Sequence, residues 1–159
     1  MKILPVLFAA GLACILPALA VEPQKPLVTL TVKRHTLDSD RDMIGRVGSN
    51  RQKTVALRVE IVNTSPAPVA ESELAGEVLV KRARNYDQIV VREPLDKIKL
   101  PAMKPNEKLT LDLGKIELNE VEWRNRKVEE TLEEWQVTCN QGTTEIGKAT
   151  SSERYQTLL

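Results

Sequence analysis

Apolar and polar residues alternate with a period of two along much of the chain after residue 27. The alternation is clearest over residues 28–32 and 55–61, where valine, leucine or isoleucine occupies every second position. Period two puts successive side chains on opposite faces of a strand, so each segment is predicted to be a half-buried strand with one wet face. The residues predicted to face the core in the second segment are Val55, Leu57, Val59 and Ile61.

Shorter segments of the same kind follow, and turn signals separate them. Strands are expected near residues 74–82, 88–92, 95–100, 109–118, 131–139 and 143–149. Pro105 suits the second position of a β-turn, Gly114 allows a bulge, and Gly142 supplies the positive φ that a short hairpin connection needs. Seven or eight such strands predict an all-β fold, an antiparallel β-sandwich.

Two segments fit this alternation less simply. Residues 38–52 are polar and contain glycine, and they are predicted to form a long loop or an edge excursion. Residues 117–134 are highly charged but keep several apolar positions, so a strand with a charged loop and a helix both remain open.

The first twenty residues have a pattern of their own. A positive charge at Lys2 precedes an almost unbroken apolar run over residues 3–16, and Ala18 and Ala20 form the A-x-A arrangement of a cleavage site. This is the composition of a secretory signal peptide. We therefore expect a mature chain that begins at Val21 and is exported to the periplasm, the cell surface or the extracellular medium.

Cys14 supports a second interpretation of this leader. Residues 11–14 resemble a lipoprotein box, in which Cys14 would be lipidated and become the mature N-terminus. However, Gly11 stands where leucine is usual, and residues 15–20 are apolar where a polar tether is usual. Cleavage after Ala20 is the preferred prediction.

Removal of residues 1–20 as a signal peptide leaves residues 21–159, a length that suits one domain with its own core. The whole chain has 23 basic and 22 acidic side chains, and the leader contributes one lysine, so the remainder is balanced. That balance argues against a nucleic-acid-binding protein, which would carry a basic excess. After the leader, no stretch is long and apolar enough to predict a transmembrane segment.

The side chains of catalytic sites are scarce in this chain. His35 is the sole histidine, so neither a Ser-His-Asp set nor a histidine-rich zinc site is expected. Cys139 is the only cysteine after the leader, and it lies in period two with Trp135 and Val137. We expect it to be a small buried residue, with a disulfide between two chains as the alternative. No catalytic residue and no cofactor are predicted.

The nearest approach to a metal site is the acidic run that contains Asp38, Asp40 and Asp42. Alternating carboxylates can converge on calcium when they lie in a turn. The full calcium-loop pattern requires glycine and glutamate at positions that Met43 and Ser49 occupy here. A solvated loop is therefore preferred over a weak calcium site.

Two features are candidates for contact with a partner. Lys81, Arg82 and Arg84 form a basic cluster at the end of a predicted strand, where they could bind an anionic partner or protect a sheet edge. Trp123 lies in a charged stretch. An exposed tryptophan could stack on a sugar or anchor a protein partner, whereas a buried one would belong to the core.

Three segments resemble the immunoglobulin-like and fibronectin-like modules of bacterial exported proteins. They are residues 54–69 (TVALRVEIVNTSPAPV), 100–114 (LPAMKPNEKLTLDLG) and 133–155 (EEWQVTCNQGTTEIGKATSSERY). The paired Cys…Trp…Cys spacing of antibody domains is absent. The resemblance implies a sandwich used for assembly or binding, in some cases in pilus-like or cell-surface assemblies, and it implies no catalytic residues.

Together these observations predict an exported, non-enzymatic β-sandwich that works through protein–protein contacts. The expected partner is another envelope protein or a second copy of the chain. The alternative is a carbohydrate-binding module of the cell envelope, with Trp123 on a glycan.

Overall fold

The computed structural model describes residues 25–44, 48–84, 87–124, 126–152 and 155, without the side chains of Ile44 and Trp123. The predicted leader, its cleavage site and Cys14 lie outside the described residues. Within the described part of the chain, no helix has the length and apolar character that crossing a membrane requires.

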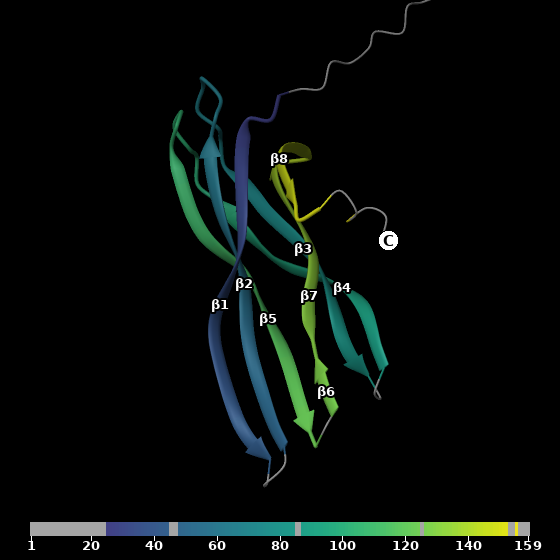
Figure 1. The fold of residues 1–159 in the computed structure, drawn as a ribbon. Helices are drawn as coiled ribbons and strands as arrows, with labels where there is room; N and C mark the ends of the chain where they lie inside the picture. The colour runs from purple at the N-terminus through teal and green to yellow at the C-terminus, as the bar shows by residue number, and fades with distance from the viewer. Residues whose placement is uncertain (1–24, 45–47, 85–86, 125, 153–154, 156–159) are drawn as a thin grey trace, which may run out of the picture.

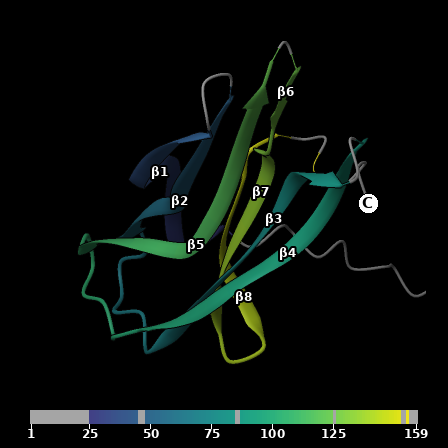
Figure 2. The ribbon, with the colours of Figure 1, turned by 90° about the horizontal axis from the view of Figure 1, so that it is seen from below.

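Eight strands form two four-stranded antiparallel sheets, so the predicted all-β sandwich is confirmed. One sheet has the order β1-β2-β5-β6 and the other has the order β4-β3-β7-β8 (Figures 1 and 2). The strands are β1 (Val28–Ile44), β2 (Gly48–Asn63), β3 (Ser72–Arg84), β4 (Asp87–Leu100), β5 (Lys108–Trp123), β6 (Arg126–Glu129), β7 (Thr131–Gln141) and β8 (Thr144–Thr150).

The core lies between the two sheets and is built from the alternating positions. The inward face predicted for β2 is confirmed, because Val55, Leu57, Val59 and Ile61 are all buried. Leu113 of β5 and Val78 of β3 are fully buried in the same cluster. This apolar contact between sheets is the main stabilising contribution that the alternating pattern implies.

The strands are longer than the sequence pattern predicted. The prediction of a long loop over residues 38–52 was wrong, because β1 and β2 extend as a hairpin that pairs Asp38 with Thr54 and Ile44 with Gly48. The segments 88–92 and 95–100 are a single strand, β4. Residues 117–134 contain the end of β5, all of β6 and the start of β7, so the helix is ruled out.

Glycines permit two of the local irregularities that shape the sheets. Gly114 has a φ of 68° beside the bulge where β5 shifts register against β2, as predicted. At Gly147 of β8, a Cβ atom would lie 2.8 Å from the carbonyl oxygen of Val28. Only glycine therefore lets β8 approach the start of β1 this closely and join the two sheets along that side.

One end of the sandwich is tied together by a buried amide. The side chain of Asn63 donates to the carbonyl groups of Ala67, Met103 and Lys104, each at 3.1 Å. Its oxygen accepts from the backbone N–H of Ser65 at 2.9 Å. At the other end the sheets separate, and β6 leads into β7 between them (Figure 1).

Candidate functional site

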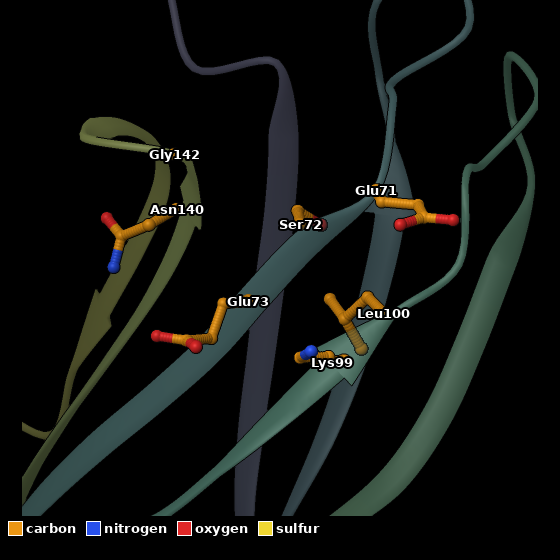
Figure 3. Close-up of a pocket in the computed structure, with 7 residues that line it drawn as sticks. All are labelled: Glu71, Ser72, Glu73, Lys99, Leu100, Asn140 and Gly142. Carbon is orange, nitrogen blue, oxygen red and sulfur yellow. The ribbon is translucent and has the colours of Figure 1, made fainter.

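A hollow at one end of the β3–β7 sheet does not gather catalytic groups. It has a volume of about 280 Å³ and is lined by Glu71, Ser72, Glu73, Lys99, Leu100, Asn140 and Gly142 (Figure 3). The carboxylates of Glu71 and Glu73 extend to opposite sides, so they do not flank a common point. The carboxylate of Glu73 forms a surface ion pair with the ammonium group of Lys97 at 2.8 Å.

The sole histidine belongs to a surface cluster on the outer face of the β1-β2-β5 sheet. Arg58 donates to both carboxylate oxygens of Asp112 at 2.9 and 3.0 Å, and a guanidinium nitrogen lies 2.8 Å from Nδ1 of His35. The hydrogen bond from Arg58 lowers the pKa of the Asp112 carboxyl below its ordinary value. Among the described residues, no nucleophilic hydroxyl or thiol contacts this cluster, and the arrangement is a cross-strand charge pair.

Asp38, Asp40 and Asp42 do not lie in a turn. They occupy alternate positions of β1, where residues two apart are separated by about 6.5–7 Å and do not converge on one ion. Asp38 accepts from the N–H of Ser39 at 2.8 Å, and Asp40 accepts from the N–H of Arg41 at 2.7 Å. Among the described residues, no three histidine, cysteine, aspartate or glutamate side chains are grouped as a metal site requires.

The basic cluster is divided by the strand that carries it. β3 lies between β4 and β7, but its pairing with β7 ends at Lys81, so Arg82 and Arg84 pair with β4 alone. Arg84 is exposed near the end of β3. Arg82 follows the buried Val80 on the inward face, and its side chain is engaged within the fold rather than presented to a partner.

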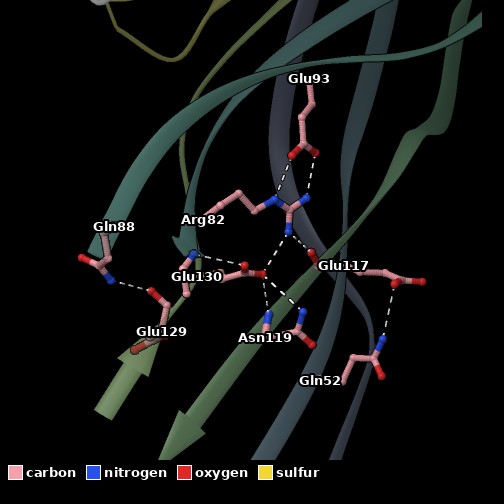
Figure 4. A network of polar contacts seen from close by, with 9 residues as sticks. Gln52, Arg82, Gln88, Glu93, Glu117, Asn119, Glu129 and Glu130 are labelled. Carbon is pink, nitrogen blue, oxygen red and sulfur yellow. Dashed lines mark hydrogen bonds and ion pairs between the residues drawn. The ribbon is translucent and has the colours of Figure 1, made fainter. Parts of the chain in front are cut away.

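Arg82 holds three segments together where the two sheets separate (Figure 4). Its guanidinium donates to both carboxylate oxygens of Glu93 at 2.8 Å and to Glu130 at 3.0 Å. It also donates to the backbone carbonyl of Glu117 in the opposite sheet at 2.5 Å. A bidentate pair of this kind fixes geometry as well as charge. Arg82 therefore holds β4 to β3 within one sheet and connects it to β5 of the opposite sheet.

Glu130 stands at the crossing from β6 to β7 and is the most buried acid of this network. Burial alone would raise the pKa of its carboxyl, but hydrogen bonds from the backbone N–H groups of Asn119 and Ala83, and the Arg82 guanidinium, outweigh it. The pKa of Glu130 therefore lies below its ordinary value. A carboxylate satisfied in this way is a structural anchor.

The hydrogen bonds of Glu130 also reveal which way the backbone of β4 faces. The N–H of Ala83 donates to Glu130 and so points away from β4. Ala83 lies opposite Gln88, and these two residues therefore form a non-hydrogen-bonded pair of the antiparallel ladder. In such a pair both residues direct their N–H and C=O groups away from each other, so those of Gln88 point away from β3. The register continues without a shift to Pro94, so Val90 and Arg92 also direct their N–H and C=O groups outward.

The outward direction is supported independently by Pro94. Proline has no N–H and is tolerated within a strand where that group would have faced away from the ladder. Pro94 therefore ends a short row of outward backbone groups, which we call the β4 strip: Gln88, Val90 and Arg92. Among the described residues, no backbone group bonds to β4 on this side.

Apolar side chains accompany the β4 strip. Val90 is 55 % exposed and Ile89 is 38 % exposed, and both are β-branched residues that favour strands. The side chain of Gln88 donates to the carbonyl of Glu129 at 3.0 Å, and Glu93 holds the other end of the strip through Arg82. The strip is therefore an anchored and unpaired strand edge, with exposed apolar side chains at Val90 and at the neighbouring Ile89.

The remaining outer strands are less accessible to another strand. β8 lies against the start of β1, and the N–H of Leu27 donates to the carbonyl of Ile146 at 2.9 Å. In the far half of β1, residues 38–44, the carboxylates of Asp38 and Asp40 accept hydrogen bonds from N–H groups of the same strand. β6 has only four residues. The β4 strip is the candidate functional site.

The other sequence-predicted residues have clear positions. The prediction that Cys139 is buried is confirmed, and its thiol lies 3.6 Å from the hydroxyl of Ser72. Burial raises the pKa of this thiol, so neither reactivity nor a disulfide between chains is favoured. Trp135 is half-buried and packs against the core. The backbone of Trp123 pairs with Gly48 and Arg126, whereas its side chain lies outside what the structure describes.

Comparisons with known proteins add little to this picture. No protein-family model matches the chain, and no curated protein matches it. Two solved structures of Bacteroides uniformis enzymes are similar: a β-glucuronidase, and β-glucuronidase 2 covalently bound to cyclophellitol-6-carboxylate aziridine. Each shares 14 % identity at a TM-score of 0.41, over 79 % of this chain and 14 % of the other. We base no conclusion on a likeness this weak, and the immunoglobulin-like or fibronectin-like assignment stays a prediction.

Sequence reasoning placed a strand at residues 88–92 but did not recognise it as the candidate site. The signal in the sequence was the run Ile89-Val90-Val91 followed by Pro94. Such a run is equally typical of a central strand. Only the strand order shows that it lies at an edge.

Proposed function

We propose that the chain is an exported, non-enzymatic β-sandwich that works through protein–protein contacts, and that a partner adds a strand to the β4 strip. The observation that supports this most directly is the row of outward backbone groups at Gln88, Val90 and Arg92, which ends at Pro94. Strand addition takes its affinity from main-chain hydrogen bonds and its specificity from the alternating side chains.

The surroundings of the strip favour binding over simple exposure. Arg82 fixes Glu93 from within the sandwich, so this half of β4 is held in place before a partner arrives. A preorganised edge loses less conformational entropy when a strand docks on it. The exposed apolar surface at Ile89 and Val90 would be covered in the same step.

The non-enzymatic part of the proposal is supported by the side chains themselves. Glu130 is occupied by structural hydrogen bonds, and Cys139 is a buried thiol. Export is supported by the leader sequence, which lies outside the described residues. The carbohydrate-binding alternative depends on the side chain of Trp123 and stays a prediction.

The test uses residues 21–159 immobilised against a solubilised envelope fraction of the native host. Val90→Lys places a charge on the outer face of the strip, which is a natural way to block strand addition. It should weaken capture of the partner about tenfold or more, a loss of about 1.4 kcal/mol of binding free energy. Val121→Lys is the matched control, since Val121 is 42 % exposed on a strand flanked on both sides.

Two results would contradict the proposal. Equal loss of the partner in the Val121→Lys and Val90→Lys variants would show that the β4 strip has no special role. Binding to a glycan array that Trp123→Ala abolishes, with no protein captured by the unmodified chain, would instead support the carbohydrate module.

A further inference from the structure

We propose that the strand added to the β4 strip comes from a second copy of this chain, with β4 paired antiparallel to β4 about a two-fold axis through Val90. This inference rests on the proposed function, because it names the partner of that same edge. A two-fold contact is self-complementary and closes after two copies, which avoids the open-ended association that an exposed edge otherwise invites.

The symmetry limits the registers that two copies can adopt. Antiparallel edge pairing places the two-fold axis perpendicular to the joined sheet, so outward-facing side chains of one copy meet outward-facing side chains of the other. The axis must then pass through a residue rather than between two residues. When it passes through Val90, Val90 faces its counterpart and Gln88 faces Arg92, so all three residues of each strip exchange backbone hydrogen bonds.

Neighbouring registers lose part of this pairing. An axis through Val91 would set Gln88 opposite Pro94, which has no N–H to donate. An axis through Arg92 would place two guanidinium groups opposite each other, and like charges directly opposite destabilise a sheet. An axis through Ile89 would move Arg92 beyond the partner's strip. The register centred on Val90 is the one that satisfies each strip completely.

The side chains agree with this register on both faces. On the outer face the two Val90 side chains meet, and each Arg92 lies beside the uncharged Gln88 of the other copy. On the inner face Ile89 meets Val91, so the exposed side chains of Val90 and Ile89 are covered together. Residues 21–159 have as many basic as acidic side chains, because the one lysine of the leader is absent, so the two copies have little net repulsion.

One acidic contact must be accommodated. Asp87 lies opposite Glu93 in this register, but both oxygens of Glu93 already accept from Arg82 at 2.8 Å. The Arg82 guanidinium, which Glu93 shares with Glu130, therefore offsets part of the charge that Asp87 would meet. The same contact that positions β4 within one copy makes the edge compatible with the other.

The interface should be small. It comprises one short strand from each copy, so it buries less than the roughly 1,200 Å² of the smallest stable protein–protein interfaces. We therefore expect a weak dimer whose population rises with concentration. Sedimentation velocity of residues 21–159 over a wide concentration range should show this rise, and Val90→Lys should remove it.

Single cysteine substitutions test the register directly. Opposite residues of a hydrogen-bonded antiparallel pair have Cα atoms about 5.5 Å apart, within the range that a disulfide spans. Val90→Cys should form a covalent dimer under mild oxidation, whereas Gln88→Cys and Arg92→Cys alone should not. A mixture of Gln88→Cys with Arg92→Cys should cross-link. Val121→Cys controls for random collision, and the native Cys139 is buried.

The outcomes separate this inference from the proposed function. If Val90→Cys does not cross-link and the chain sediments as a monomer, the second copy is not the partner. The proposed function would still stand if Val90→Lys abolished capture of another envelope protein. Equal cross-linking by Val90→Cys, Gln88→Cys and Arg92→Cys would overturn the register and indicate undirected contact.

Discussion

β1 and β4 are both outer strands of their sheets, but the far half of β1 and the first half of β4 differ in how their outward backbone groups are satisfied. In β1, the carboxylates of Asp38 and Asp40 accept from the N–H groups of the residues that follow them. In β4, the outward groups of Gln88, Val90 and Arg92 have no such side-chain partner among the described residues. The comparison shows that one outer strand satisfies its own outward N–H groups with carboxylates, whereas the other leaves its outward backbone groups unpaired among the described residues.

The two edges also differ in what supports them. β4 is anchored from inside by Arg82, whose side chain is 24 % exposed and whose partner Glu130 is 9 % exposed. The far half of β1 is solvent-exposed and is held by its pairing with β2. The proposed binding edge is thus held from the interior by Arg82, whereas the edge of β1 has side-chain carboxylates on its N–H groups.

The largest effect is expected from Arg82→Ala. The substitution leaves Glu93 and Glu130 without their shared counter-charge and releases β4 from the opposite sheet. We expect the free energy of unfolding to fall by about 3 kcal/mol, the lower end of the range for breaking a buried pair, because Arg82 keeps some exposure. Urea unfolding of both proteins measures this difference.

Arg84→Ala is the control for Arg82→Ala, since Arg84 lies on the same strand and is exposed. It should change stability by less than about 0.5 kcal/mol. The β4 strip should also lose binding in Arg82→Ala even under conditions where the variant is folded. If Arg82→Ala were as stable as the unmodified chain, the hydrogen bonds of Arg82 would not anchor β4.

A smaller effect is expected from acid. The pKa of Glu130 is lowered in the folded chain, so its contribution to stability is fully present above the ordinary carboxyl pKa of 4.5 and is lost as the pH falls through the folded value. Glu130→Gln should flatten the decline of stability below that pH. Thermal unfolding of both proteins between neutral and acidic pH measures the change in slope, and parallel curves would contradict it.

The sandwich itself was predictable from the sequence because burial and the period of two are directly linked. The inward set around Leu57, the bulge at Gly114 and the turn glycine Gly142 all follow from single-strand patterns. Each is decided by a few neighbouring residues. No partner strand has to be known before they can be recognised.

The candidate site was not predictable, because an edge is a property of strand order. The basic residues Lys81 and Arg82 were predicted to contact a partner or to protect an edge, but the side chain of Arg82 points inward and binds the opposite sheet. The acidic run at Asp38 looked like a loop because it lacks apolar alternation. Its strand structure comes from pairing with β2, and no local pattern encodes that pairing.

The smallest effect on stability, but an informative one, is expected from removing the guard on β1. Asp38→Ala combined with Asp40→Ala frees the N–H groups of Ser39 and Arg41, so this edge becomes available for pairing while stability changes by less than about 0.5 kcal/mol. Light scattering should then show concentration-dependent association that Val90→Lys does not suppress. Asp42→Ala is the matched control, because it removes a charge from the same strand and leaves the hydrogen bonds of Asp38 and Asp40 in place.

Calcium should not shift the melting temperature of the unmodified chain. The three carboxylates lie two residues apart along a strand, and those of Asp38 and Asp40 already accept a hydrogen bond. A calcium-dependent rise that disappears in Asp40→Ala would show that the run binds metal, and the contrast between a guarded and an open edge would then fail.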